Sequence, residues 1–161
     1  KNPVNNPAEI GTLMLEFGML SKLTGNPVYF DKAKHAITEV FKRKSFIGLV
    51  GTTINVETGE WQNTETHISG MIDSYYEYLI KSYLLFDDKD FKVMYDESIS
   101  AVNKYLLDSA STGWWYAHAD MNTGEKTQTV FGALDAFMPA MLVLGDDLKT
   151  AEQIQQSSCK I

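Results

Sequence analysis

Two short segments repeat one turn sequence and set the organisation of the chain: Asn55-Val-Glu-Thr-Gly-Glu-Trp61 and Asp120-Met-Asn-Thr-Gly-Glu-Lys126. Each contains a polar turn with a glycine suited to positive φ, and each follows a run of β-type residues. The two Thr-Gly-Glu triplets lie 65 residues apart. The repeat predicts two short β-hairpins, over 51–61 and 113–126.

The rest of the chain has apolar residues at helical spacing, divided by turn residues. This pattern predicts six helices, at 8–23, 27–43, 70–86, 89–107, 131–144 and 147–158. Residues that end or cap helices separate the members of each pair: Thr24-Gly-Asn-Pro27, Asp87-Asp88 and Gly145-Asp146. The repeating unit is therefore helix, short loop, helix and hairpin, present twice with a third copy begun.

Helix pairs that repeat in this way have to stack side by side, because each pair buries its apolar face only against a neighbour. Such stacks form an open solenoid or close into a ring of inner helices covered by outer ones. The first helix of each pair is apolar on more than one face, which favours the ring. We therefore predict an all-α fold, part of an α/α barrel whose helix pairs are joined by short β-hairpins. Three pairs are too few to close a ring, so residues 1–161 are expected to be part of a larger domain.

Acidic residues on the predicted inner helices are the strongest candidates for a functional site. Glu16 and Glu77 lie 61 residues apart, about one repeat, so we expect them at equivalent depths on neighbouring helices. Asp73 precedes Glu77 by four residues, which puts both carboxylates on one helical face. The segment from Asp73 to Leu79 mixes carboxylates with tyrosines, as carbohydrate sites do. A solvated acidic face is the alternative interpretation.

The histidines and tryptophans are weaker candidates. His67 precedes the Asp73 helix and is near Glu65, so it is a candidate for the mouth of a substrate cavity, with packing as the alternative. His35 is expected on the surface of an outer helix, and His118 in an exposed loop. The tryptophans lie at the hairpins, where they either anchor the hairpin or stack on a sugar. No spacing of histidines and acids by itself indicates a metal site.

Three segments resemble the class I α-mannosidases, glycoside hydrolase family 47. Gly11–Gly25 is similar to the family's G-T-L-x-x-E-F-x-x-L-S-x-L-T-G helix, Asp73–Lys81 to its D-S-Y-Y-E-Y-L-L-K helix, and Ile54–Trp61 to its I-x-x-x-T-G-x-W hairpin. Their order and spacing agree as well. Leu134–Pro139 is closer to the bacterial and quality-control-type members than to the Golgi enzymes, because it lacks the histidine of the Golgi type.

The resemblance implies an (α/α)7 barrel that removes α-1,2-linked mannose from oligomannose N-glycans with inversion, using a calcium ion at the barrel floor. It implies that Asp73 is a catalytic carboxylate, as acid or as base, and that Glu16 and Glu77 surround the sugar and the hydrated calcium ion. An inverting hydrolase needs two carboxyl groups. The second one and the direct calcium ligand are expected outside residues 1–161. No direct metal ligand is therefore assigned within this segment, which we expect to be inactive alone.

Other functions stay open. A protein on the same fold could bind mannose glycans without efficient hydrolysis, and a different toroidal sugar enzyme would share the helix pattern. In a helical-repeat scaffold, Asp73, Glu77 and Glu16 would point to solvent on an outer face.

Composition narrows the partners and the location. The chain has 21 acidic and 14 basic residues, a net charge of −7, so binding to nucleic acid or to an anionic membrane is not expected. No apolar stretch is long enough to span a membrane. The expected partners are an oligomannose glycan or glycoprotein and the missing parts of the same catalytic domain. The resemblance implies a location outside the cytoplasm, in the bacterial periplasm or medium or in the endoplasmic reticulum lumen. The single cysteine, Cys159, and the absence of an Asn-x-Ser/Thr site favour the bacterial option slightly.

Overall fold

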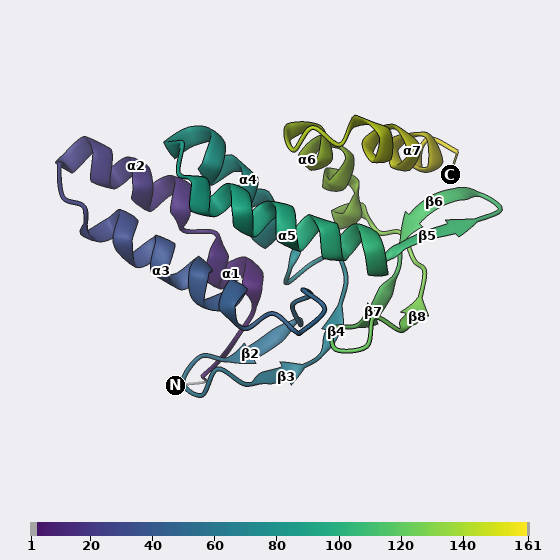
Figure 1. Ribbon diagram of the computed structural model, residues 1–161, viewed down its shortest axis with the longest axis horizontal. Coiled ribbons are helices and arrows are strands. Elements are labelled where there is room, and N and C mark those ends of the chain that lie inside the picture. Colours follow the sequence, from purple (N-terminus) through teal and green to yellow (C-terminus); the bar gives the residue numbers. More distant parts are fainter. Residues whose placement is uncertain (1–2, 161) are drawn as a thin grey trace.

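The computed structural model describes residues 3–160. Three helix pairs stand side by side, with small β-sheets below them in the view of Figure 1. The pairs are α2 (Met14–Thr24) with α3 (Val28–Lys42), α4 (Asp73–Phe86) with α5 (Lys89–Tyr105), and α6 (Met138–Leu144) with α7 (Leu148–Ser158). The first helix of the middle pair, α4, contacts both α2 and α6. The predicted succession of helix pairs is therefore confirmed.

The turns inside the pairs fall at the predicted residues. Gly25 ends α2 in the left-handed conformation, with φ of 72°, which glycine adopts without strain. Asp87 is left-handed after α4, and the Asp88 carboxylate then accepts a hydrogen bond from the Asp90 backbone N–H (3.1 Å). The Asp147 carboxylate caps α7 by accepting from the Thr150 N–H (3.1 Å). Short capped turns of this kind force the two helices of each pair to run antiparallel.

The strands form three small sheets, so the all-α prediction is too simple. The first sheet is β1 (Val4–Asn5), β2 (Thr53–Asn55) and β3 (Trp61–Asn63), and the second is β4 (Glu65–Thr66), β7 (His118–Asp120) and β8 (Lys126–Gln128). The third pairs β5 (Leu107–Ala110) with β6 (Gly113–Tyr116). The two predicted hairpins form as β2–β3 and β7–β8, with Gly59 and Gly124 at positive φ in their turns. Residues 113–116, expected in the second hairpin, pair with β5 instead.

Three predicted helix boundaries are also wrong. The helix expected over 8–23 is broken after α1 (Pro7–Gly11), where the Thr12 backbone leaves the helical conformation with φ of −100° and ψ of 45°. The helix expected over 131–144 begins as a 3₁₀ turn, η1 (Ala133–Phe137). The helix expected to reach residue 107 stops at Tyr105, because β5 pairs with the aromatic strand β6.

The core lies between the helix pairs and includes tyrosines that the sequence had suggested for sugar contact. Tyr75 and Tyr76 of α4 are 0% and 1% exposed. Their rings pack edge to face, with centroids 5.3 Å apart. The aromatic side chains beside Asp73 therefore fill the core, and only Tyr78 of this group is partly exposed. Trp61 anchors the first hairpin, since its indole N–H donates to the Arg43 carbonyl (2.7 Å).

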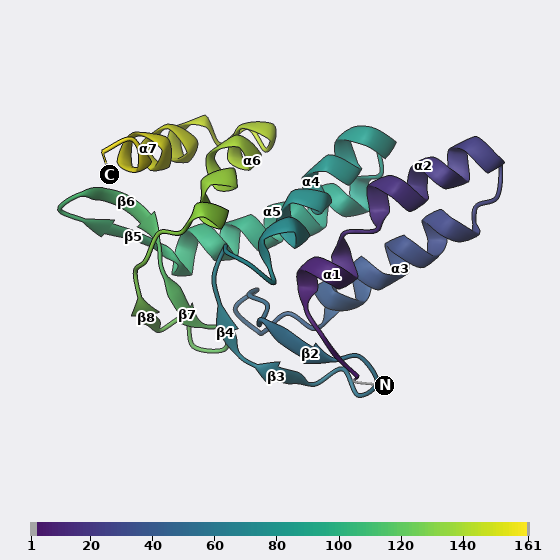
Figure 2. The same cartoon turned by 180° about the vertical axis from the view of Figure 1, so that it is seen from behind.

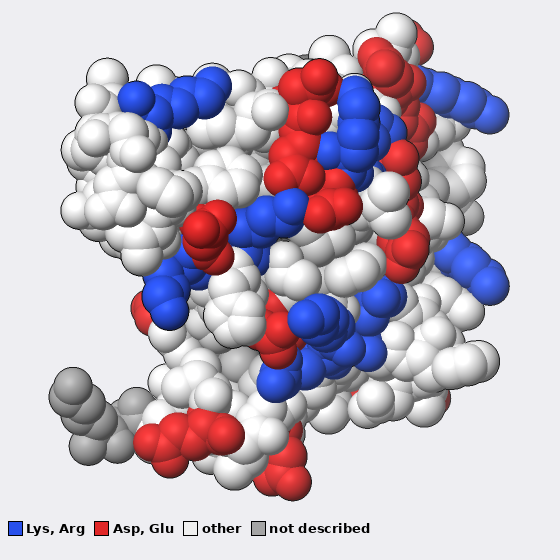
Figure 3. Space-filling model, turned by 60° about the vertical axis from the view of Figure 1, so that its left-hand side comes forward, with Lys and Arg blue, Asp and Glu red and all other residues white. Residues whose placement is uncertain are grey.

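Charges of both signs alternate on the surface. On the face drawn in Figure 3, lysines and arginines lie beside acids instead of forming a patch of one sign. Ion pairs such as Lys34–Asp88 (2.7 Å) and Lys92–Asp96 (2.6 Å) connect such neighbours. None of the helices in the described part of the chain combines the length and apolar character needed to cross a membrane.

Candidate functional site

Asp73 is the first residue of α4, and the backbone around it is held in place from two sides. Its Oδ1 accepts hydrogen bonds from the Ser74 N–H (2.7 Å) and hydroxyl (3.2 Å). Just before it, Met71 has a left-handed backbone with φ of 73°, which is strained for a residue with a side chain. The Met71 carbonyl accepts from the Ala8 N–H at the start of α1 (2.8 Å). The half-buried carboxylate of Asp73 therefore has a fixed position at a positive helix end.

Glu16 on α2 and Glu77 on α4 both lie close to Tyr78. The Tyr78 hydroxyl on α4 donates to Glu16 Oε1 on α2 (2.9 Å). Partial burial, the hydrogen bond to Glu16 and the negative charges of Glu16 and Glu77 raise the pKa of Tyr78 to about 12. Lys81, one turn along α4, donates to Glu77. Glu16 is exposed and Glu77 is half-buried.

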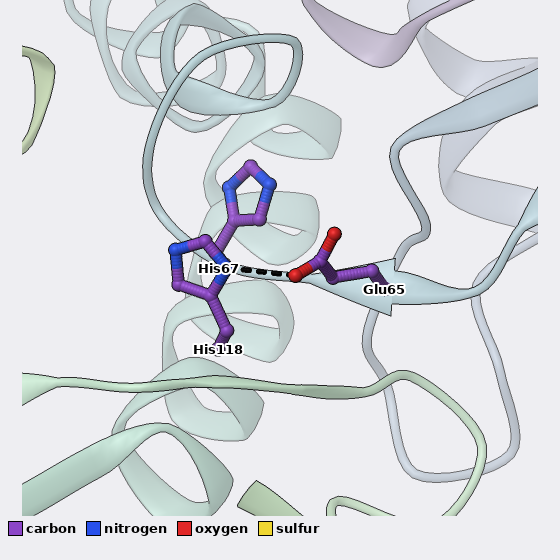
Figure 4. Close-up of side chains that lie close together, drawn as sticks. All are labelled: Glu65, His67 and His118. Carbon is purple, nitrogen blue, oxygen red and sulfur yellow. Dashed lines mark hydrogen bonds and ion pairs between the residues drawn. The ribbon is translucent and has the colours of Figure 1, made fainter. Parts of the chain in front are cut away.

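A second group of titratable side chains lies at the sheet of β4, β7 and β8. His118 Nδ1 is 2.8 Å from Glu65 Oε1, and the His67 and His118 rings have centroids 4.4 Å apart. Figure 4 shows the two rings one above the other, with the Glu65 carboxylate approaching from the side. His67 is 8% exposed, and its Nδ1 accepts from the Ser69 N–H (3.1 Å).

The strand register explains this group. β4 pairs antiparallel with β7, with Glu65 opposite Asp120 and Thr66 opposite Ala119. Continuing the same register by one residue places His67 opposite His118. Glu65 and His67, two positions apart, project from the same face of the extended chain.

His67 also connects this group to Asp73. Its pKa is lowered, chiefly by burial and then by the charge of His118, while Glu65, Asp135 and Asp73 oppose the shift. His67 is therefore neutral at neutral pH. The negative charge of Asp73 thus acts on His67, and the expected position of His67 at a cavity mouth stays a prediction.

Sequence reasoning missed two of these residues. His118 was expected in an exposed loop, but its side chain is 16% exposed and contacts Glu65. Glu65 was considered only as a neighbour of His67. The missing signal was the pairing of β4 with β7, between residues more than 50 positions apart. His35 is exposed on α3, as expected.

Comparisons with known proteins extend along the whole chain. The sequence model of glycosyl hydrolase family 47 matches residues 1–161. The chain is 38% identical over 151 residues to alpha-mannosidase I MNS4 of Arabidopsis thaliana, which covers 94% of this chain and 24% of that protein. It is 37% identical over 151 residues to human ER degradation-enhancing alpha-mannosidase-like protein 2, with 94% and 25% covered. It is 34% identical over 148 residues to human mannosyl-oligosaccharide 1,2-alpha-mannosidase IB, with 91% and 23% covered.

A solved structure agrees with these relatives. The alpha-1,2-mannosidase from Trichoderma reesei matches 96% of this chain and 35% of its own, with a TM-score of 0.84 and 28% identity. The chain spans about a quarter of the length of the curated relatives described above. Since the family match extends over all 161 residues, the chain belongs to glycosyl hydrolase family 47.

Proposed function

We propose that this chain is a segment of an inverting α-1,2-mannosidase that trims mannose from oligomannose N-glycans. The observation that carries the proposal is the arrangement around α4. Asp73 stands at the start of this helix, and Glu16 reaches the same helix from α2 through Tyr78, beside Glu77. The relatives named as mannosidases support this reading.

In this proposal, residues 1–161 form a partial α/α-barrel catalytic domain. The similarity to the fungal mannosidase supports a barrel, as does the contact of α4 with both α2 and α6. Apolar side chains are exposed on both flanking pairs, including Leu20 and Leu23 on α2 and Val143 on α6. Further helices of the domain would cover these flanks.

Hydrolysis with inversion assigns two separate tasks to carboxyl groups. One group protonates the glycosidic oxygen, and the other removes a proton from the water that attacks the anomeric carbon from the opposite side. We assign one of these tasks to Asp73, because it is fixed in position at the start of α4. The second group would come from another part of the protein. Glu16, Glu77 and His67 are proposed to contact the sugar, directly or through water.

The calcium ion implied by the family fits the oxygen ligands of Glu16 and Glu77 better than the histidine group. Ca²⁺ prefers carboxylate, carbonyl and water oxygens, and imidazole nitrogen is a poor ligand for it. Glu16 and Glu77 already have partners in Tyr78 and Lys81, so we propose that they hold the ion through water. When bound, such an ion orients oxygen groups of the substrate.

We place the whole protein in the endoplasmic reticulum lumen or secretory pathway. The support is that a relative is named as ER degradation-enhancing and that the substrate class is glycosylated protein. The relatives described above are eukaryotic, and none of them supports the bacterial alternative.

The deciding experiment measures mannose release from α-1,2-linked mannobiose by the full-length protein, with and without a calcium chelator. We expect Asp73→Asn to lower kcat by roughly 10²–10⁴-fold, because it removes an acid–base group. The matched control is Asp31→Asn, at an exposed residue of α3, which should leave kcat unchanged. Proton NMR should show β-mannose as the first product, since the substrate is α-linked.

Three outcomes would contradict the proposal. Mannobiose bound without release by the wild type would indicate a glycan-binding protein. First-formed α-mannose would exclude inversion. Full activity of residues 1–161 alone would mean that this segment already contains both carboxyl groups.

A further inference from the structure

We propose that Glu65, His67 and His118 form a binding site for a divalent transition-metal ion of the zinc type, separate from the calcium ion of the proposed function. One oxygen or nitrogen of each side chain lies within 4.8 Å of those of the other two. All three side chains come from the sheet of β4 and β7 or the residue that follows it. No other group of three such ligands occurs within residues 3–160.

The ligand types decide which ion fits. Two imidazoles and one carboxylate form a set that zinc binds in many proteins, with a fourth position left for water. Imidazole suits zinc, copper, iron and nickel, whereas calcium and magnesium prefer oxygen. The site therefore selects against the ion that the family is expected to use.

The distances require only a modest closure. Two ligands at about 2 Å from a tetrahedral zinc ion lie roughly 3.3 Å apart. His118 Nδ1 and Glu65 Oε1 are 2.8 Å apart, so this pair would open by roughly 0.5 Å with an ion in place of the proton that they share. Since the ligand atoms all lie within 4.8 Å of one another, no pair would have to close by more than roughly 1.5 Å. The Glu65 side chain, 39% exposed, is free to supply much of this movement.

Metal binding costs one existing contact. The Ser69 N–H donates to His67 Nδ1, which puts the His67 proton on Nε2. A metal ion at Nδ1 replaces this bond directly, and an ion at Nε2 moves the proton to Nδ1, where it faces the Ser69 N–H. In both cases the loop between β4 and α4 has to give up this hydrogen bond.

The surroundings also fit a bound cation. Asp73 and Asp135 add negative charge near His67. Glu65 lines a surface depression with Asp120 and Gln128, so the carboxylate side of the group is open to solvent.

A bound ion would tie β4 to β7 and would make His67 a metal ligand instead of a direct sugar contact. It would thereby connect the segment that precedes Asp73 with the second hairpin unit. The inference stands independently of hydrolysis, since binding and not mannose release is measured.

The test is zinc titration of the full-length protein by competition with a chromophoric chelator, with calcium at saturating concentration in every sample. We expect one zinc ion per chain, and at least a tenfold weaker affinity in both His67→Ala and His118→Ala, since even losses outside the ligand shell cost 10–100-fold. The matched control is His35→Ala, at the exposed histidine of α3, which should bind zinc as the wild type does. Cobalt in place of zinc should give a visible absorption spectrum that the two variants lose.

Two results would overturn the proposal. One is a wild type that leaves zinc with the chelator, and the other is unchanged zinc affinity in both histidine variants. Glu65→Gln keeps the size of the side chain and a hydrogen-bonding oxygen, so it tests the site even if an alanine variant fails to fold. We expect it also to weaken zinc binding, and unchanged binding would remove Glu65 from the site.

Discussion

The helices α2 and α4 carry the two segments that most resemble family 47, and they differ in how far they are buried. α4 contacts α1, α2, α5 and α6. Figure 2 shows these helices from behind. It buries Tyr75, Tyr76, Leu79, Ile80 and Ser82. α2 contacts α3 and α4 and buries only Met14 and Gly18, while Phe17, Met19, Leu20 and Leu23 are exposed.

The difference follows from the number of neighbours and not from the apolar content of the two helices. α4 stands in the middle of the row and is covered on both sides by described residues. α2 stands at the edge of that row, so its second apolar face meets no helix among residues 3–160. An exposed apolar face of this size usually marks an interaction surface. We therefore expect the side of α2 that faces away from α4 to be covered in the whole protein.

The largest expected effect is a difference in stability between two leucine-to-alanine variants, one in α4 and one in α2. Leu79→Ala removes a fully buried side chain of α4 and should lower the free energy of unfolding by about 2–5 kcal/mol. Leu23→Ala removes a side chain of α2 that is 80% exposed. It should change the free energy of unfolding by less than about 0.5 kcal/mol. Urea denaturation of residues 1–161 measures both.

The same pair of variants in the full-length protein tests the covering of α2. If further helices pack on this face, the cost of Leu23→Ala rises toward that of a buried leucine. An unchanged small cost in the longer protein would show that α2 keeps its exposed face.

A smaller effect is expected where Gly18 of α2 meets the Phe86 ring of α4. A Cβ at Gly18 would lie 2.3 Å from Cζ of Phe86, whose ring is held edge to face by Phe30 at a centroid distance of 5.3 Å. Gly18→Ala should therefore destabilise the chain by about 1–3 kcal/mol. In a Phe86→Leu background the penalty should shrink, because the obstructing ring is gone. A penalty that stays the same in both backgrounds, measured by urea denaturation, would place the strain elsewhere.

The sequence predicts local structure well where one residue decides it. Gly25 and Gly124 mark turns that need a left-handed backbone, and Asp88 marks a helix start. It fails at the break after Gly11, where the Thr12 backbone leaves the helical conformation, and at β5, which depends on pairing with a later strand. These features leave no periodic signal in the chain.

In the candidate site, too, features decided locally could be predicted and features decided by distant strand pairing could not. Helical spacing predicts that Glu16 lies on one helix and that Asp73 and Glu77 lie on another, as α2 and α4 show, but the equal depth expected from the repeat of about 61 residues is not seen, since Glu16 is exposed and Glu77 is half-buried. The group of Glu65, His67 and His118 depends on a register between β4 and β7, which the spacing of these residues does not reveal. The tyrosines beside Asp73 were misread for a different reason, since a ring in the core and a ring in a sugar site have the same composition.

The smallest effect concerns the hydrogen bond from Tyr78 on α4 to Glu16 on α2. Tyr78→Phe removes the donor to Glu16 and should lower the free energy of unfolding by about 0.5–1.5 kcal/mol at neutral pH. The value should lie at the lower end, because Glu16 is exposed and water replaces the lost donor. Tyr78 has a folded pKa of about 12, raised above its unfolded value near 10, so its contribution is complete below about pH 10 and declines as the pH rises toward 12. Ultraviolet difference spectra of wild type and Tyr78→Phe isolate this titration, and Glu16→Gln should lower its pKa. A Tyr78 that titrates near pH 10 in the wild type would mean that α2 and α4 do not join through these side chains in solution.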